Sequence, residues 1–229
     1  DTATTPEDTP ISRNVLANDA DPDGDTLTVT QFSYQSNGVT ATYSVGATTR
    51  SILDGSGNPI GTIQVSANGN YTFTPAANWN GTVPVITYTA SDGTSTATAT
   101  LSLTVTAVND PPTAGTLTAN AVEVGCNVSG SGATGSLLTG ASDENTASLT
   151  ISQVSSEAQG TSTNSNGTTE VYVQGLYGKL YFLESGAYRY VLDNTNPVVD
   201  ALNTSNTPTD KFYFTVKDNG NLTTTSTLT

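Results

Sequence analysis

The clearest pattern in the chain is a strict alternation of apolar and hydroxyl-bearing residues between Thr94 and Ala107. Ala97, Leu101 and Val105 fall on one parity, whereas threonines and a serine fall on the other. A period of two residues is typical of a β-strand with one buried face and one solvated face. Shorter stretches of the same kind predict further strands at 27–32, 61–66, 71–75 and 83–89.

Turn-forming dipeptides separate these alternating stretches. Asp-Gly at 23–24 and 92–93 and Asn-Gly at 68–69 favour the positive φ angles of tight turns. The segment ANGN at 67–70 therefore predicts a hairpin. One helical turn is expected in NPVVDALN at 196–203, where a proline stands at an N-terminal position. Taken together, these patterns predict an all-β chain.

The second half of the chain repeats the first half. Three matches occur in the same order, which indicates two copies of one module. They are 15–33 with 137–155, 61–73 with 178–190, and 86–93 with 212–220. Several short strands per copy predict a β-sandwich, and Pro111 and Pro112 cannot continue a central strand. We therefore expect two tandem Greek-key, Ig/cadherin-like sandwiches at 1–110 and 111–229, with the last strand of the second copy cut short.

Composition narrows the possible functions. The 229 residues carry 20 acidic and 6 basic side chains, a formal net charge of −14, no histidine or methionine, and one cysteine, Cys126. The lack of histidine excludes histidine-assisted nucleophilic catalysis, and a single cysteine excludes an internal disulfide. The negative charge disfavours nucleic acid and anionic lipid, and no apolar run is long enough to insert into a membrane. Because no initiator methionine is present, we expect a fragment of a longer protein.

Candidate chemistry is concentrated in the acidic run DADPDGD, which holds Asp19, Asp21, Asp23 and Asp25. Alternating carboxylates on one loop repel each other unless a cation lies between them, and an all-oxygen ligand set suits Ca²⁺ better than zinc or copper. The spacing begins like an EF-hand loop, but Thr30 stands where the bidentate glutamate is required. An EF-hand is therefore excluded, and a solvated acidic turn without metal is the alternative.

Longer segments resemble known bacterial repeats. TPEDTP (5–10), NDADPDGDTLTV (18–29) and residues 88–112, which end in VNDPP, resemble a bacterial cadherin-like repeat. Residues 173–194 and 210–220 of the second copy resemble a VCBS-type repeat. Both are similar to extender modules of large RTX adhesins that bacteria export by type I secretion. The resemblance implies an extracellular location at the bacterial cell surface, neighbouring repeats of the same polypeptide as partners, and Ca²⁺ as the cofactor.

The resemblance also implies which residues hold the ions. Cadherin-like modules bind Ca²⁺ at domain junctions through a glutamate, an Asn-Asp linker and two aspartate loops. Carried over to this sequence, the central junction uses Glu7, Asn109, Asp110, Asp143 and Asp218, with Glu144 and Asn145 as additional oxygen donors. The N-terminal pole uses Asp19, Asp21, Asp23, Asp25 and Asp92. Because the second copy keeps one aspartate where the first has four, the central site is expected to be the weaker one.

The function implied is mechanical. Ca²⁺ at domain junctions would stiffen a non-catalytic segment that projects an adhesive tip for cell adhesion and biofilm formation. The alternative is a carbohydrate-binding module, because Tyr181 and Tyr213 have the parity opposite to that of their core-facing neighbours, and exposed rings can stack on glycans. Paired carboxylates can hydrolyse glycosides without histidine. The acids here lie on turns and do not flank a groove, so we expect no enzyme.

Overall fold

The computed structural model describes residues 1–122, 131–160, 162–201 and 207–229, so Cys126 lies outside the described residues. The chain forms two compact units, unit 1 (residues 1–108) and unit 2 (residues 109–229). The sequence placed the domain boundary after residue 110, whereas the compact units divide after Val108. Asn109 and Asp110 therefore belong to unit 2.

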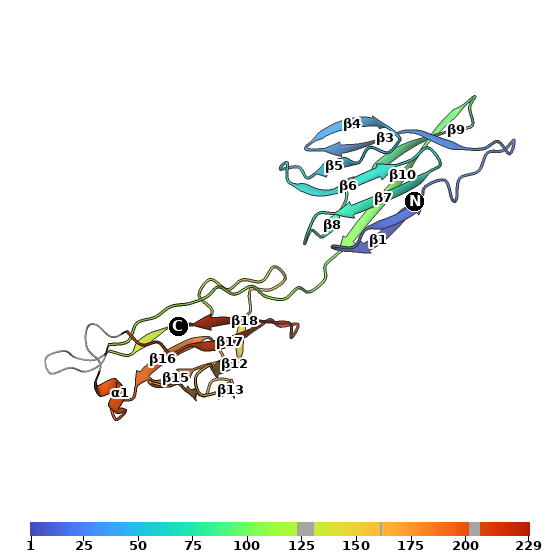
Figure 1. Ribbon diagram of the computed structural model, residues 1–229. Helices are drawn as coiled ribbons and strands as arrows, with labels where there is room; N and C mark the ends of the chain where they lie inside the picture. The colour runs from blue at the N-terminus through green and yellow to red at the C-terminus, as the bar shows by residue number, and fades with distance from the viewer. Residues whose placement is uncertain (123–130, 161, 202–206) are drawn as a thin grey trace. The chain divides into compact units, whose positions relative to one another are not determined.

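Unit 1 is a sandwich of two sheets (Figure 1). One sheet has the order β1 (Thr2–Pro6), β10 (Thr96–Thr106), β9 (Ile86–Ser91), β3 (Thr28–Ser36) and β4 (Val39–Ser44), and β8 (Gly81–Thr82) pairs with β10. The other has the order β2 (Ile11–Asn14), β7 (Asn70–Pro75), β6 (Pro59–Val65) and β5 (Arg50–Leu53). β1 runs parallel to β10, and the chain crosses repeatedly between the two sheets.

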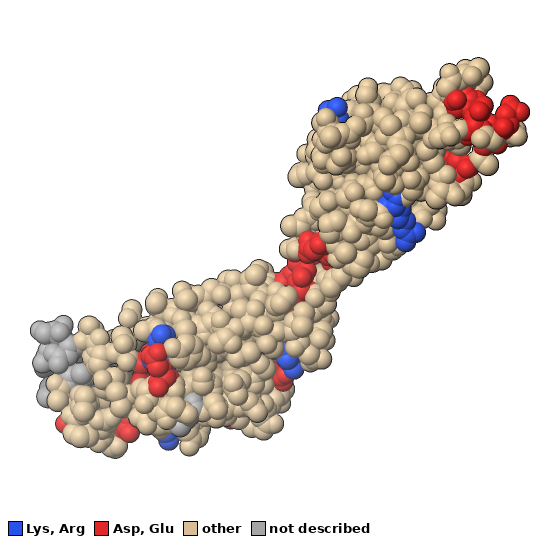
Figure 2. Space-filling view, turned by 45° about the vertical axis from the view of Figure 1, so that its right-hand side comes forward, with Lys and Arg blue, Asp and Glu red and all other residues tan. Residues whose placement is uncertain are grey.

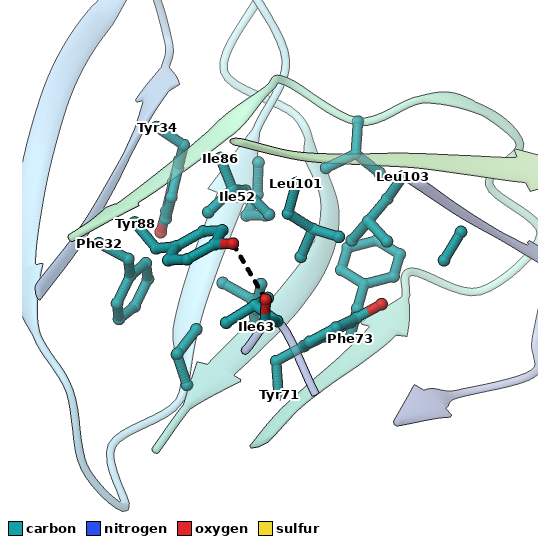
Figure 3. Close-up of a cluster of buried hydrophobic side chains, with 14 of the residues drawn as sticks. Phe32, Tyr34, Ile52, Ile63, Tyr71, Phe73, Ile86, Tyr88, Leu101 and Leu103 are labelled. Atoms are coloured by element: carbon teal, nitrogen blue, oxygen red, sulfur yellow. Dashed lines mark hydrogen bonds between the residues drawn. The ribbon is translucent and has the colours of Figure 1, made fainter. Parts of the chain in front are cut away.

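The core of unit 1 lies between these sheets and follows the predicted alternation. β7 and β9 bury every second residue, and the largest fully buried side chains include Phe32, Tyr34, Phe73 and Tyr88 (Figure 3). The predicted hairpin at 67–70 is confirmed as the β6–β7 turn, in which Gly69 has a φ of +84°. A Cβ atom there would lie 2.6 Å from Asn14 Oδ1, so glycine is required.

One part of the predicted long strand behaves differently. Leu101 and Val105 are buried as expected, but Ala97 is exposed, so its predicted place on a buried face is wrong. β1 pairs only with residues 102–106 of β10. The N-terminal half of β10 therefore has β9 as its sheet neighbour and forms an uncovered margin of the sandwich.

The strands of unit 2 pair in the same order as β2–β7, β9 and β10 of unit 1. One sheet has the order β11 (Ala133–Ser136), β16 (Ala187–Leu192), β15 (Gly178–Phe182) and β14 (Val171–Gln174). The other has the order β13 (Ser162–Asn164), β12 (Thr150–Ser156), β17 (Phe212–Lys217) and β18 (Thr223–Leu228). A parallel bridge from Leu117 to Leu228 takes the place of the β1–β10 pairing. The chain is thus all-β and forms two Ig-like β-sandwiches.

Details of strand pairing also recur between the units. The β3–β9 pair is irregular between Val29 and Gln31, and the β12–β17 pair is irregular at the aligned position, between Ile151 and Gln153. A β-bulge of this kind redirects side chains and sharpens the local twist. Its recurrence supports the internal alignment on which the repeat was predicted.

The predicted helical turn is confirmed as α1 (Pro197–Asp200). Asn196 is its N-cap and accepts a hydrogen bond from the backbone N–H of Val198, while Pro197 occupies the first turn, where no N–H partner is needed. Residues 202–203 of the predicted segment lie outside the described part of the chain. In the part that is described, no helix is long and apolar enough to cross a membrane.

Candidate metal centre

One set of predicted ligands gathers in unit 2 and is called here the linker cluster: Asn109, Asp110, Asp143, Asn145 and Asp218. Asp218 follows β17 and is only 2% exposed. Its Oδ1 accepts a hydrogen bond from the N–H of Leu222 (2.7 Å), and its Oδ2 accepts one from Asn109 Nδ2 (2.6 Å). Asn109 lies against Gly220, where a Cβ atom would come within 2.5 Å of the amide nitrogen. The first residue of unit 2 is therefore seated on the β17–β18 turn.

The second part of the linker cluster is the loop after β11. Asp143 Oδ1 accepts hydrogen bonds from the N–H groups of Asn145 (2.8 Å) and Thr146 (2.7 Å), which closes the loop as an Asx turn. Asn145 Oδ1 in turn accepts the N–H of Asp110 at 2.8 Å. The loop that carries Asp143 therefore also holds the backbone of Asp110.

Two oxygen atoms in the linker cluster have no partner. Oδ2 of Asp110 and Oδ2 of Asp143 are each buried and accept no hydrogen bond. A buried carboxylate oxygen without a donor is costly, so such an atom in a folded protein calls for an ordered water or an ion. Carboxylate and amide oxygens are the ligands that Ca²⁺ prefers. The residues of the linker cluster therefore fit a Ca²⁺ ion, whereas Glu144 is exposed and takes no part in these hydrogen bonds.

Glu7 is the predicted ligand at the end of β1 in unit 1. It is 2% exposed, its Oε1 accepts the N–H of Val108 at 2.5 Å, and its Oε2 has only a long contact of 3.5 Å with Asn80 Nδ2. Within the described residues, no basic side chain lies at ion-pair distance from Glu7. A buried carboxylate with so few donors is poorly satisfied by its own unit.

The other predicted set is called here the acidic cluster of unit 1: Asp19, Asp21, Asp23, Asp25 and Asp92. Figure 2 shows acidic side chains gathered at one end of this unit. Asp21 Oδ1 accepts the N–H groups of Asp23 (2.8 Å) and Asp25 (3.2 Å), and both of those residues are exposed. An open pocket of about 650 Å³ is lined by Asp19, Asp21 and Asp25 together with Asn14 and Asn68.

Asp92 lies on the β9–β10 turn of unit 1. Its Oδ1 accepts the N–H groups of Thr94 and Ser95, each at 2.6 Å. These hydrogen bonds from Ser95 and Thr94 lower the pKa of Asp92. The carboxylate is therefore engaged by its own turn.

Tyr88 is a polar contact of the acidic cluster that the sequence pattern did not reveal. Its buried hydroxyl lies 2.9 Å from Asp1 Oδ2, 2.9 Å from Asp19 Oδ2 and 3.0 Å from the Val15 carbonyl. A hydroxyl has one proton and can donate to one of these acceptors at a time. Burial, followed by the hydrogen bond to Asp19, raises the pKa of Tyr88 to about 12. The only sign of this contact in the sequence was a tyrosine at an inward-facing strand position.

Neither set is a complete metal site made of acids alone. Among residues 1–122, 131–160, 162–201 and 207–229, no three Cys, Asp or Glu side chains approach closely enough to hold an ion. The linker cluster differs from the acidic cluster because it combines two unpartnered carboxylate oxygens with a buried aspartate and an asparagine.

The two tyrosines of the carbohydrate alternative are not brought together. Tyr181 lies on β15 and Tyr213 on β17, which belong to different sheets of unit 2. The Arg189 guanidinium lies 3.8 Å from the centroid of the Tyr181 ring and forms an ion pair with Glu170 at 2.7 Å.

Tyr213 is also engaged within unit 2. It donates a hydrogen bond to Glu157 at 2.6 Å, and Lys211 Nζ lies 5.0 Å from its ring centroid. Each of the two rings therefore already has a cationic neighbour within unit 2.

Comparison with known proteins finds a family model that matches most of the first unit. Residues 1–104 match the family model described as Bacterial Ig domain. No curated protein matches the chain. The titin domains z1z2 in complex with telethonin are 14% identical over 99% of this chain and 90% of theirs, with a TM-score of 0.29. An endo-fucoidan hydrolase from glycoside hydrolase family 107 is 15% identical over 99% of this chain, with a TM-score of 0.31. This chain spans only 27% of the hydrolase. Residues 1–104 are therefore similar to the bacterial Ig domain family.

Proposed function

We propose that this chain is a non-catalytic extender segment of a bacterial cell-surface adhesin, and that it binds Ca²⁺ at the linker cluster of unit 2. The observation that carries the proposal is the pair of buried, unpartnered oxygens of Asp110 and Asp143. They belong to the residue types and positions that the resemblance to adhesin extenders implies. The tandem Ig-like architecture suits a spacer, because neither unit depends on the other for its core.

The residues of the linker cluster would have different roles in binding the ion. Asp110 and Asp143 would offer the two free oxygens, while Asp218 and Asn109 keep the start of unit 2 on the β17–β18 turn. A bound Ca²⁺ ion supplies positive charge and oxygen coordination to carboxylates that the protein alone leaves unsatisfied. Because Asp110 lies just after the unit boundary, its fixation would restrain the connection between the units. That Glu7 contributes a further oxygen stays a prediction.

A shift in stability with Ca²⁺ tests the proposed ion binding. Extracellular modules bind Ca²⁺ with a Kd of roughly 10⁻⁴ to 10⁻³ M, so concentrations about 100 times the Kd should stabilise unit 2 by about 2.7 kcal/mol. We expect the melting temperature of the full chain to rise with Ca²⁺ and to fall with a chelator. Asp143→Asn should abolish the response. Asp200→Asn, at an exposed position on α1, is the control and should keep it.

The mechanical part of the proposal needs a separate measurement. Small-angle scattering should show a narrower distribution of interatomic distances with Ca²⁺ than with a chelator, and Asp143→Asn should remove the difference. An ion that stabilises unit 2 without changing the scattering would leave a calcium-binding domain but contradict the extender role. No effect of Ca²⁺ on either measurement would contradict the proposal as a whole.

A further inference from the structure

The linker residues are held on unit 2 by hydrogen bonds that need no ion. Besides Asn109 on Asp218 and Asp110 on Asn145, Thr113 donates its N–H to the Ser142 carbonyl at 2.7 Å, and Ser142 returns its N–H to the Thr113 carbonyl at 3.1 Å. Pro112, which lies between Asp110 and Thr113 in the sequence, is buried. Residues 109–113 are thus an ordered part of unit 2 and do not form a free linker.

Asn145 has a special place among these contacts. Its side-chain oxygen accepts the N–H of Asp110, and its own N–H is donated to Asp143 Oδ1, both at 2.8 Å. It therefore joins the two residues whose Oδ2 atoms are buried and unpartnered. At the aligned position of unit 1, Asp23 donates its N–H to Asp21 in the same way, and its side chain is exposed.

We propose that Asn145 is a positioning residue that holds the Asp110 carboxylate beside the Asp143 carboxylate, and that it is not itself a Ca²⁺ ligand. This inference rests on the proposed Ca²⁺ binding at the linker cluster. The side-chain oxygen that the sequence counted as an additional ligand is already engaged by the Asp110 backbone. Groups that orient metal ligands commonly matter about 10- to 100-fold in affinity when removed.

The test is hydrogen exchange of the full chain, read by mass spectrometry during a CaCl₂ titration. Peptides that cover residues 107–114 and 143–149 report on the linker cluster separately from unit 1. In wild type, we expect protection of both segments to increase with Ca²⁺. Asn145→Ala should move the midpoint to about 10-fold higher Ca²⁺ or beyond, and should speed exchange at Asp110 even without Ca²⁺.

Two further variants separate positioning from a general loss of structure. Asn145→Asp keeps an oxygen that can accept the Asp110 N–H, so it should restore a midpoint at or below that of wild type. Asn164→Ala removes another exposed asparagine of unit 2, one that accepts a hydrogen bond from Gln153 at 3.0 Å, and should leave the midpoint unchanged.

The outcomes distinguish the inference from the function on which it rests. If wild type shows Ca²⁺-dependent protection and Asn145→Ala has the same midpoint, the positioning role is overturned and Ca²⁺ binding stands. If Asn145→Ala and Asn164→Ala shift the midpoint equally, the positioning role is also overturned. If wild type shows no Ca²⁺-dependent protection in these segments, the proposed function fails and the role of Asn145 fails with it.

Discussion

The acidic cluster of unit 1 and the linker cluster of unit 2 occupy aligned loops but differ in how they use their carboxylates. The acidic cluster has more acids than the linker cluster, but Asp23 and Asp25 are exposed. The linker cluster has fewer acids, but Asp218 is buried and two aspartate oxygens lack partners. An exposed carboxylate is satisfied by water, whereas a buried one needs a partner. Burial, more than the number of acids in a loop, therefore determines which carboxylates need a partner.

The comparison bears on an expectation drawn from the sequence. Counting aspartates predicts that the central site is the weaker one, and this stays a prediction until affinities are measured. The geometry favours the opposite order, because the linker cluster already holds its residues in place through Asn109 and Asn145. Preorganised ligands lose less freedom when they bind.

The largest expected effect is a loss of stability on replacing the buried Asp218, compared with replacing its aligned counterpart Asp92. Asp218→Ala removes the acceptor of two hydrogen bonds in a buried place, and we expect unit 2 to lose about 2–4 kcal/mol of its unfolding free energy. Asp92→Ala in unit 1 should cost much less. Urea unfolding can assign the loss to a unit, because the single tryptophan, Trp79, reports on unit 1 while circular dichroism reports on both. Equal losses for the two variants would erase the distinction between the clusters.

A second pair of variants tests the polar link that only unit 1 has. Phe214 takes the place of Tyr88 in unit 2, and Ala141 aligns with Asp19. Tyr88→Phe should destabilise unit 1 by about 1–2 kcal/mol through the lost hydrogen bond. Phe214→Tyr should destabilise unit 2 by about 1–3 kcal/mol, since it adds volume to a filled core. Stabilisation by Phe214→Tyr, seen as a higher urea midpoint, would show that unit 2 has an acceptor ready there.

Alkaline pH should destabilise unit 1 through the same residue, Tyr88. The pKa of Tyr88 in the folded protein is raised to about 12 from the ordinary 10, so its contribution is fully present below pH 10 and is lost as pH rises from 10 toward 12. The urea midpoint reported by Trp79 should therefore fall over this range, and Tyr88→Phe should reduce the fall. An unchanged pH profile in the variant would show that another group governs the loss.

The smallest expected effect concerns Glu144, which the sequence placed among the ligands. Its side chain is exposed and absent from the hydrogen bonds of the linker cluster. Glu144→Ala should change stability by no more than about 0.5 kcal/mol, and calorimetric Ca²⁺ titration should give the wild-type affinity. A clear loss of affinity would return Glu144 to the ligand set and enlarge the linker cluster.

Most of the fold could be predicted because local sequence patterns indicate its strands and turns. Alternation with period two located the core strands, Asn-Gly located the β6–β7 turn, and the internal alignment matched the repeated bulge of β3 and β12. The exposed end of β10 could not be predicted, because alternation does not say where the neighbouring strand β1 stops pairing.

The residue types of the candidate site could be predicted from the sequence, but the burial and hydrogen bonding of their oxygens could not. The sequence indicated that Asp110, Asp143 and Asp218 matter, yet which oxygens are buried and unpartnered depends on contacts between segments more than 30 residues apart. For the same reason the sequence alone did not reveal the link from Tyr88 to Asp19 or the hold of Asn145 on Asp110.

The attachment of residues 109–113 to unit 2 also bears on how such a module can be cut and rejoined. A division at the two prolines, which the sequence suggests, would strip unit 2 of Asn109 and Asp110 and leave Asp218 without its amide donor. A division after Val108 leaves these contacts of unit 2 complete, and it also keeps the hydrogen bond that the N–H of Val108 donates to Glu7 within unit 1. The natural building block thus carries its connecting segment at its front end, and copies joined in series would each bring that segment along.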